Sequence, residues 1–113
     1  MQLTEMAGPG GVWRVLVPES RRERMRGLRG YPPPGPREAM LLRRCRSIQT
    51  FGLRQTITVA FLGPGMEVLE VHRCRRGRIV WARSRGARHA LECADGWTPT
   101  VGDRFSLAAR GPR

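Results

Sequence analysis

Two histidines and two of the three cysteines are spaced so that they could bind a metal ion. His72 and Cys74 are two residues apart in one stretch that favours a strand, and His89 and Cys93 are four apart in another. Each pair therefore shares one face of its strand. Brought together, the two pairs would form a tetrahedral zinc site with two Cys and two His ligands. The spacing matches no standard zinc-binding motif, so zinc binding is the weakest of the functions that the sequence suggests.

The acidic residues form no arrangement suited to acid and base catalysis. Glu67 and Glu70 fall on opposite faces of an expected strand, and Asp95 and Asp103 fall in expected turns, where local backbone hydrogen bonding explains them. The sequence also lacks a glycine-rich phosphate loop and a Ser–His nucleophile motif. We therefore expect a protein that is not an enzyme and that uses no cofactor.

The loop at residues 51–56 is a candidate binding segment. Phe51, Leu53 and Arg54 place an aromatic and an aliphatic side chain beside a cation, next to Gly52. Loops held by a rigid scaffold often carry binding residues. The sequence favours a non-catalytic binding or accessory module that presents a sheet face and this loop to a protein partner or a small ligand. A competing interpretation places Phe51 and Leu53 in the core beneath the strands that follow.

The charge of the chain suggests a second function, the binding of a polyanion or nucleic acid. All 21 basic residues are Arg, and the formal net charge is +12. Arg suits phosphate because its planar fork donates two hydrogen bonds at once, although codon bias in a GC-rich genome also enriches Arg. Trp81 or Trp97 could stack on bases. The densest group, here called the basic cluster, is Arg73, Arg75, Arg76, Arg78, Arg83, Arg85 and Arg88.

Most of the elements that would position these residues are short strands. They are expected at 12–17, 39–42, 57–62, 66–73, 79–81, 88–93 and 105–108. Ser20 and Glu23 have the spacing of a capping box, which predicts a short helix that Gly27 or Gly30 would end. The pattern predicts a β-rich α+β fold, a small β-sandwich or half-open barrel of about seven strands with one helix near the N-terminus.

A chain of 113 residues has the length of one domain. We expect a flexible lead-in at residues 1–10, a globular domain at 11–109 and a disordered tail at 110–113. Three widely spaced cysteines argue against a disulfide framework and for a reducing compartment. Neither an export signal nor a long apolar run is visible, so the cytoplasm is the expected location.

Six motifs in order resemble those of the domain-of-unknown-function 192 family. They are Arg26-Gly27-Leu28, Ala39-Met40-Leu41-Leu42, Phe51-Gly52-Leu53-Arg54, the strand at 57–62, Ala90-Leu91-Glu92 and Gly102-Asp103. The chain would be a short, Arg-rich member of this family of uncharacterised bacterial proteins. The resemblance implies a small β-sandwich-like domain and brings no established activity. One departure is Thr58, which stands where the family usually has Asp; its hydroxyl could satisfy the same backbone donor.

Overall fold

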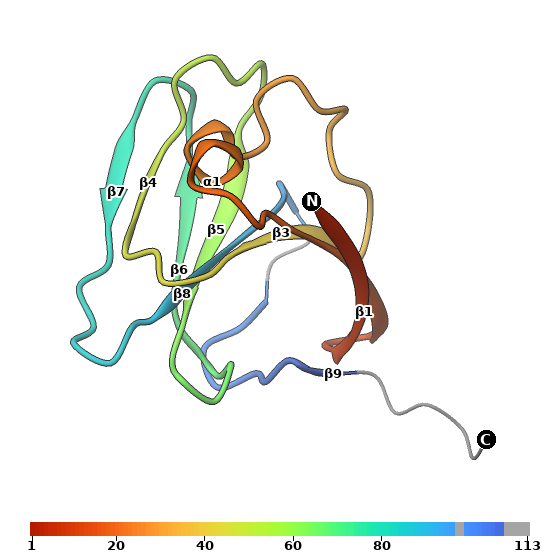
Figure 1. The fold of residues 1–113 in the computed structure, drawn as a ribbon. Helices are drawn as coiled ribbons and strands as arrows, with labels where there is room; N and C mark the ends of the chain where they lie inside the picture. The colour runs from red at the N-terminus through yellow and green to blue at the C-terminus, as the bar shows by residue number, and fades with distance from the viewer. Residues whose placement is uncertain (97–98, 108–113) are drawn as a thin grey trace.

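A computed structural model describes residues 1–96 and 99–107, which form nine strands and one helix (Figure 1). The elements are β1 (Gln2–Gly8), β2 (Gly11–Val17), α1 (Arg21–Arg26), β3 (Glu38–Leu42), β4 (Ser47–Gln49), β5 (Ile57–Leu62), β6 (Val68–Cys74), β7 (Ile79–Trp81), β8 (His89–Ala94) and β9 (Ser106–Leu107). The predicted β-rich α+β fold is confirmed, and its sheets do not close into a barrel. Trp97 and the predicted tail at 110–113 lie outside the described residues.

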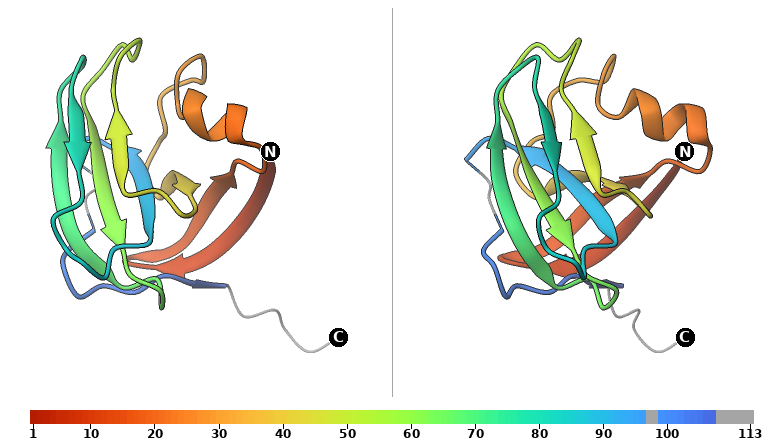
Figure 2. Two further views of the ribbon diagram at one scale, coloured as in Figure 1. Left: turned by 60° about the vertical axis from the view of Figure 1, so that its left-hand side comes forward. Right: turned by 90° about the vertical axis from the view of Figure 1, so that its left-hand side faces the viewer.

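Seven of these strands form one large sheet with the order β6-β5-β8-β3-β2-β1-β9. All pairs are antiparallel except β2 and β3, which run parallel. Parallel neighbours need a long crossover connection. Residues 18–37 provide it, and they include α1 and the proline-rich loop at 32–36. The crossover carries α1 over one face of the sheet, which Figure 2 shows from two sides.

Strand β5 is buried on both of its faces. Ile57, Val59 and Phe61 belong to one apolar cluster, and Ala60 and Leu62 belong to the cluster on the opposite face. This division follows the alternation of side chains along a strand, as the sequence predicts. The core therefore has two layers, one on each face of the large sheet. No helix within the described residues is long and apolar enough to cross a membrane.

The prediction of a flexible lead-in at residues 1–10 is wrong. Residues 2–8 form β1, which pairs with β2 from Gln2 opposite Val17 to Gly8 opposite Gly11. The hairpin turns at Pro9 and Gly10, and Gly10 has a φ of 80°. Proline followed by a residue with positive φ is the pattern of a type II turn. This segment therefore forms an ordered turn between two paired strands and not a flexible lead-in.

The remaining two strands, β4 and β7, form a small antiparallel sheet. Its Ile48 packs in the same apolar cluster as Leu28, which follows α1, so helix and small sheet cover the same face of the large sheet. The hydroxyl of Thr50, just after β4, is fully buried; it donates to the Arg75 carbonyl over 2.6 Å and accepts from the Arg78 amide over 2.8 Å. These bonds fix the turn that leads into β7.

Candidate ligand-binding cleft

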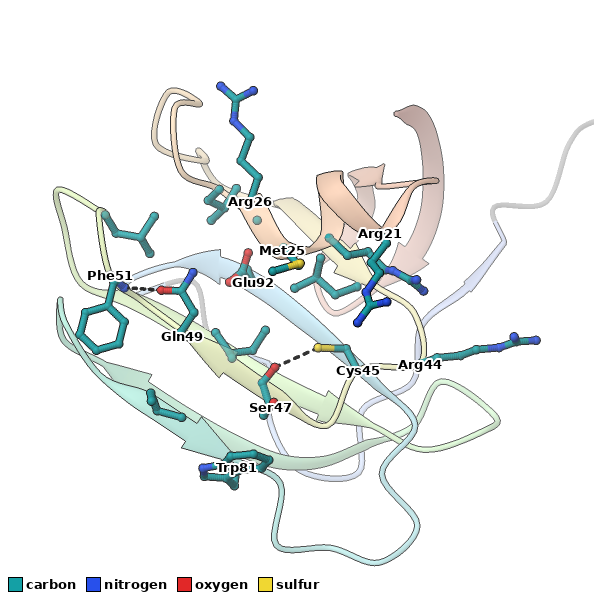
Figure 3. Close-up of a pocket in the computed structure, with 17 residues that line it drawn as sticks. Arg21, Met25, Arg26, Arg44, Cys45, Ser47, Gln49, Phe51, Trp81 and Glu92 are labelled. Carbon is teal, nitrogen blue, oxygen red and sulfur yellow. Dashed lines mark hydrogen bonds between the residues drawn. The ribbon is translucent and has the colours of Figure 1, made fainter.

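A cleft of about 510 Å³ lies between α1 and the β4–β7 sheet (Figure 3). Its lining residues come from α1, the end of β3, β4, the turn after β4, β7 and β8. They are Arg21, Arg24, Met25, Arg26, Gly27, Leu28, Leu42, Arg44, Cys45, Ser47, Ile48, Gln49, Phe51, Leu53, Ile79, Trp81 and Glu92. The cleft is mainly apolar, with arginines at its rim and one carboxyl.

That carboxyl belongs to Glu92 of β8, and Glu92 is only 2% exposed. The backbone amide of Leu28 donates to it, and among the described residues its Oε1 atom has no hydrogen-bond partner. Burial raises the pKa of Glu92 to about 7. A buried polar atom without a partner is unusual, because it has lost water without gaining another hydrogen bond. Glu92 is therefore the group in the cleft with the clearest unmet capacity to bind.

The last turn of α1 covers this carboxyl. Gly27 ends the helix, as predicted, with a φ of 56°. A Cβ atom at this position would lie 3.1 Å from Oε1 of Glu92. Position 27 therefore favours glycine for two reasons: its φ is positive, and its backbone lies close to the Glu92 carboxyl.

The predicted capping box at the other end of α1 is confirmed. The Glu23 amide donates to the Ser20 hydroxyl and the Ser20 amide donates to the Glu23 carboxylate, each over 3.1 Å. The amino group of Met1 lies 3.0 Å from the same carboxylate and, with the backbone amides, lowers the pKa of Glu23 to about 2. No residue of α1 is buried, so the helix is held by its ends and by Leu28.

Positive charge gathers at the Cys45 end of the cleft. Figure 3 shows Arg21 and Arg44 at this end, and the charge of Arg24 acts on the Cys45 thiol. Within residues 1–96 and 99–107, none of these three arginines forms an ion pair. Arg26 points away from the cleft instead, where its Nε donates to the Arg29 carbonyl.

The structure brings two of the three predicted loop residues to the cleft. Phe51 is 51% exposed, so it is not the core residue of the competing interpretation, whereas Leu53 is half-buried and packs against the core. Both line the cleft. Arg54 is exposed and lines a neighbouring hollow beside Tyr31. Whether these residues bind anything stays a prediction.

The basic cluster is divided by the fold. Arg75, Arg76 and Arg78 lie at the turn before β7, whereas Arg83, Arg85 and Arg88 lie in the loop after it, at the other end of the strand (Figure 1). All seven side chains of the cluster are exposed. Arg73 donates two hydrogen bonds of 2.9 Å to the Asp95 carboxylate, so its charge is already paired. The cluster thus offers two separate basic patches.

The predicted zinc ligands do not meet. Strand β5 separates β6 from β8, and Cys74 and Cys93 belong to the apolar clusters on opposite faces of the sheet. His72 contacts Glu70 over 2.8 Å, and His89 accepts from the Arg44 amide over 3.1 Å. The described part of the chain contains no group of three or more His, Cys, Asp or Glu side chains that could hold a metal ion.

Sequence reasoning missed Glu92 as a site residue. The signal was present, because Glu92 is a single charged residue within the apolar stretch Ala90-Leu91-Glu92-Cys93. A charge in the middle of a strand that is buried on both sides must be paired, neutralised or functional. Its neighbours in the cleft come from distant segments, so the sequence could not show what surrounds it.

Comparison with known proteins establishes the fold alone. No family model matches the chain, and no curated protein matches it. A solved structure of a protein of unknown function from Novosphingobium aromaticivorans is similar, with a TM-score of 0.76 and 18% identity over 95% of this chain and 86% of that one. A putative transcription regulator from Sinorhizobium meliloti is similar too, with a TM-score of 0.77 and 16% identity over 91% and 90% of the two chains.

Proposed function

We propose that this protein is a non-catalytic module that binds a small organic ligand in the cleft between α1 and the β4–β7 sheet. The observation that carries the proposal is the buried Glu92 carboxyl, whose Oε1 lacks a hydrogen-bond partner among the described residues. A ligand with an N–H or ammonium group would supply the missing donor. Gly27 covers Oε1, so a ligand reaches that atom when the last turn of α1 moves.

The shape of the cleft favours a small ligand over a protein partner. Its volume of about 510 Å³ falls within the usual range for small-molecule sites, which are mostly apolar with a few polar groups. A protein surface would contact the rim, but it would not reach a carboxyl at the floor. The 51–56 loop contributes to this site through Phe51 and Leu53.

The lining residues support binding more than catalysis. Burial raises the pKa of the Cys45 thiol, and the thiol contacts the Ser47 carbonyl, so Cys45 lacks the thiolate character of a nucleophile. Glu92 has a pKa suited to proton transfer, but neither a histidine nor a second carboxyl accompanies it among the residues that line the cleft.

We also propose that the chain belongs to the domain-of-unknown-function 192 family. Four of the motifs that resemble this family meet at the cleft, namely those at 26–28, 39–42, 51–54 and 90–92. The segment at 26–28 touches Glu92, and the segment at 51–54 forms a wall. Motifs that share one site are expected to be retained together. Relatives collected by sequence should therefore keep Gly27 and Glu92 as a pair, and their independent loss would count against membership.

The cleft can be tested with anilinonaphthalene sulfonate, a fluorescent dye that combines an apolar body with an anionic group. We expect one molecule to bind per chain and Ile79→Glu to abolish binding, because Ile79 lines the cleft and is 57% exposed. Val12→Glu is the matched control, since Val12 is 51% exposed on β2 and lies outside the cleft. Equal binding by the two variants would refute the proposal.

A displacement series tests the role of the carboxyl. Small aromatic amines and amides should displace the dye from the native protein more strongly than matched ethers without N–H groups. In Glu92→Gln this preference should fall, while the exposed Glu5→Gln serves as the control for a lost surface carboxylate. A preference unchanged by Glu92→Gln would show that Glu92 does not select the ligand.

A further inference from the structure

The geometry points to a nucleoside monophosphate as the ligand, with its phosphate at the arginine end of the cleft and its base between Phe51 and Glu92. This inference rests on the proposed function of the cleft. It follows from the order of three chemistries along the cleft: cations at the Cys45 end, a hydrogen-bonding floor, and exposed aromatic and apolar side chains along β4–β7 and the turn after β4.

The arginine end has the chemistry of a phosphate site. Arg21 and Arg24 come from one turn of α1, and Arg44, in the segment after β3, lines the same end of the cleft with its side chain extended outward (Figure 3). A guanidinium donates bidentately to phosphate oxygens, and several together suit a dianion. Glu23, the acid of α1, does not compete for them, because its carboxylate is held by the cap and by the Met1 amino group.

The aromatic part of the cleft suits a planar ring. The described residues include seven large hydrophobic side chains that are exposed, and four of them, Met25, Phe51, Ile79 and Trp81, line this one cleft. Such a concentration on a small domain marks a binding surface. Bases stack on aromatic side chains with little regard to sequence, so Phe51 and Trp81 are suited to hold one.

The floor of the cleft can select the edge of a base. When the last turn of α1 moves, the Glu92 carboxyl can accept from a base N–H. Gln49, on β4, can add its side-chain NH2 as a donor, because its Oε1 accepts from the Phe51 amide. Guanine presents two neighbouring N–H donors, at N1 and at its 2-amino group, so a carboxylate can accept from both. The inference therefore takes guanosine monophosphate as its probe.

Isothermal titration of the full chain compares guanosine monophosphate, guanosine and inorganic phosphate. We expect the nucleotide to bind at least about tenfold more tightly than either part, because each end of the cleft adds binding energy. Arg24→Gln should weaken binding of the nucleotide about tenfold and leave guanosine unchanged. Arg22→Gln is the matched control, since Arg22 is exposed on the same helix but does not line the cleft.

The other outcomes are separable. Phosphate binding as tightly as the nucleotide would overturn the inference and leave a simple anion site. Dye binding that the nucleotide does not displace, but that other N–H ligands displace through Glu92, would also overturn it while the proposed function stands. The terminal nucleotide of a short single-stranded oligonucleotide could bind in place of a free nucleotide. Weaker oligonucleotide binding by Arg24→Gln would support binding in the cleft. A loss of binding confined to Arg75→Gln would place the site on the basic cluster and overturn the inference.

Discussion

The ionisation of Glu92 should make the folded protein less stable as the pH rises from about 4.5 to about 7. Burial raises the pKa of this carboxyl from 4.5 to about 7. In the folded state the group is therefore protonated over a range in which the unfolded chain has already lost the proton. Below pH 4.5 both states are protonated and the group contributes no penalty. Above pH 7 both are ionised, and the folded state carries the full cost of a buried charge.

The size of the effect follows from the pKa difference. Each pKa unit corresponds to about 1.4 kcal/mol, so a shift from 4.5 to about 7 corresponds to about 3 kcal/mol. A small domain has a free energy of unfolding of about 5–15 kcal/mol. The titration of this single side chain should thus remove a measurable part of the stability near neutral pH.

Urea unfolding of the native protein and Glu92→Gln at several pH values measures the difference. Glu23 and Glu70 have pKa values lowered to about 2, so they destabilise both proteins in strong acid and cancel in the comparison. Relative to native, Glu92→Gln should gain about 3 kcal/mol between pH 4.5 and pH 8. If the amide introduced by Glu92→Gln itself changes the stability, it changes the free energy of unfolding of the variant by the same amount at every pH and leaves the pH dependence of the difference unaltered. A difference that stays flat over this range would refute the reasoning.

Two further substitutions test the packing around the cleft. Gly27→Ala should destabilise the fold by about 1–3 kcal/mol, because its positive φ is strained for alanine and the methyl group would meet Oε1 of Glu92. Gly96→Ala, with a φ of 90° and no atom of the described residues beyond its chain neighbours within 4 Å of the added methyl, should cost less in the same urea assay. Thr50→Val should cost about 1–3 kcal/mol by removing two buried hydrogen bonds, while Thr50→Ser keeps the hydroxyl and most of the stability. Equal free energies of unfolding within each pair of variants would contradict both assignments.

Local patterns in the sequence predicted the elements that depend on near neighbours. The alternation at Ile57, Val59 and Phe61 predicts a strand and its faces, and Ser20 with Glu23 predicts where the helix begins. These signals operate within a few residues, and tertiary packing agrees with them. The segment at 8–11 carried a turn signal as well. The strand before it, β1, could not be recognised from the sequence because its place depends on pairing with β2.

The candidate site was less accessible to prediction because it depends on sheet order. Each His–Cys pair does share a strand face, yet the two pairs lie on opposite faces of the sheet, because the register sets both Cys74 and Ala94, and not Cys93, opposite Ile57 of β5. In the same way, the cleft joins side chains from α1, β4 and β8 that are up to about 70 residues apart in the chain. The periodicity of a strand shows which of its residues point the same way. It does not show toward which face of the assembled sheet they point, because that depends on the pairing with neighbouring strands.

The shallow attachment of α1 has a consequence for how binding would be detected. The helix buries none of its own residues, and it lies within a crossover of 20 residues between β2 and β3. Segments with few buried contacts open at a lower free energy than the core, so their amide hydrogens exchange first. A ligand that bridges α1 and β4 would close this segment. Slower amide exchange across 21–28, with unchanged exchange in β5, would then report occupancy without any knowledge of the ligand's identity.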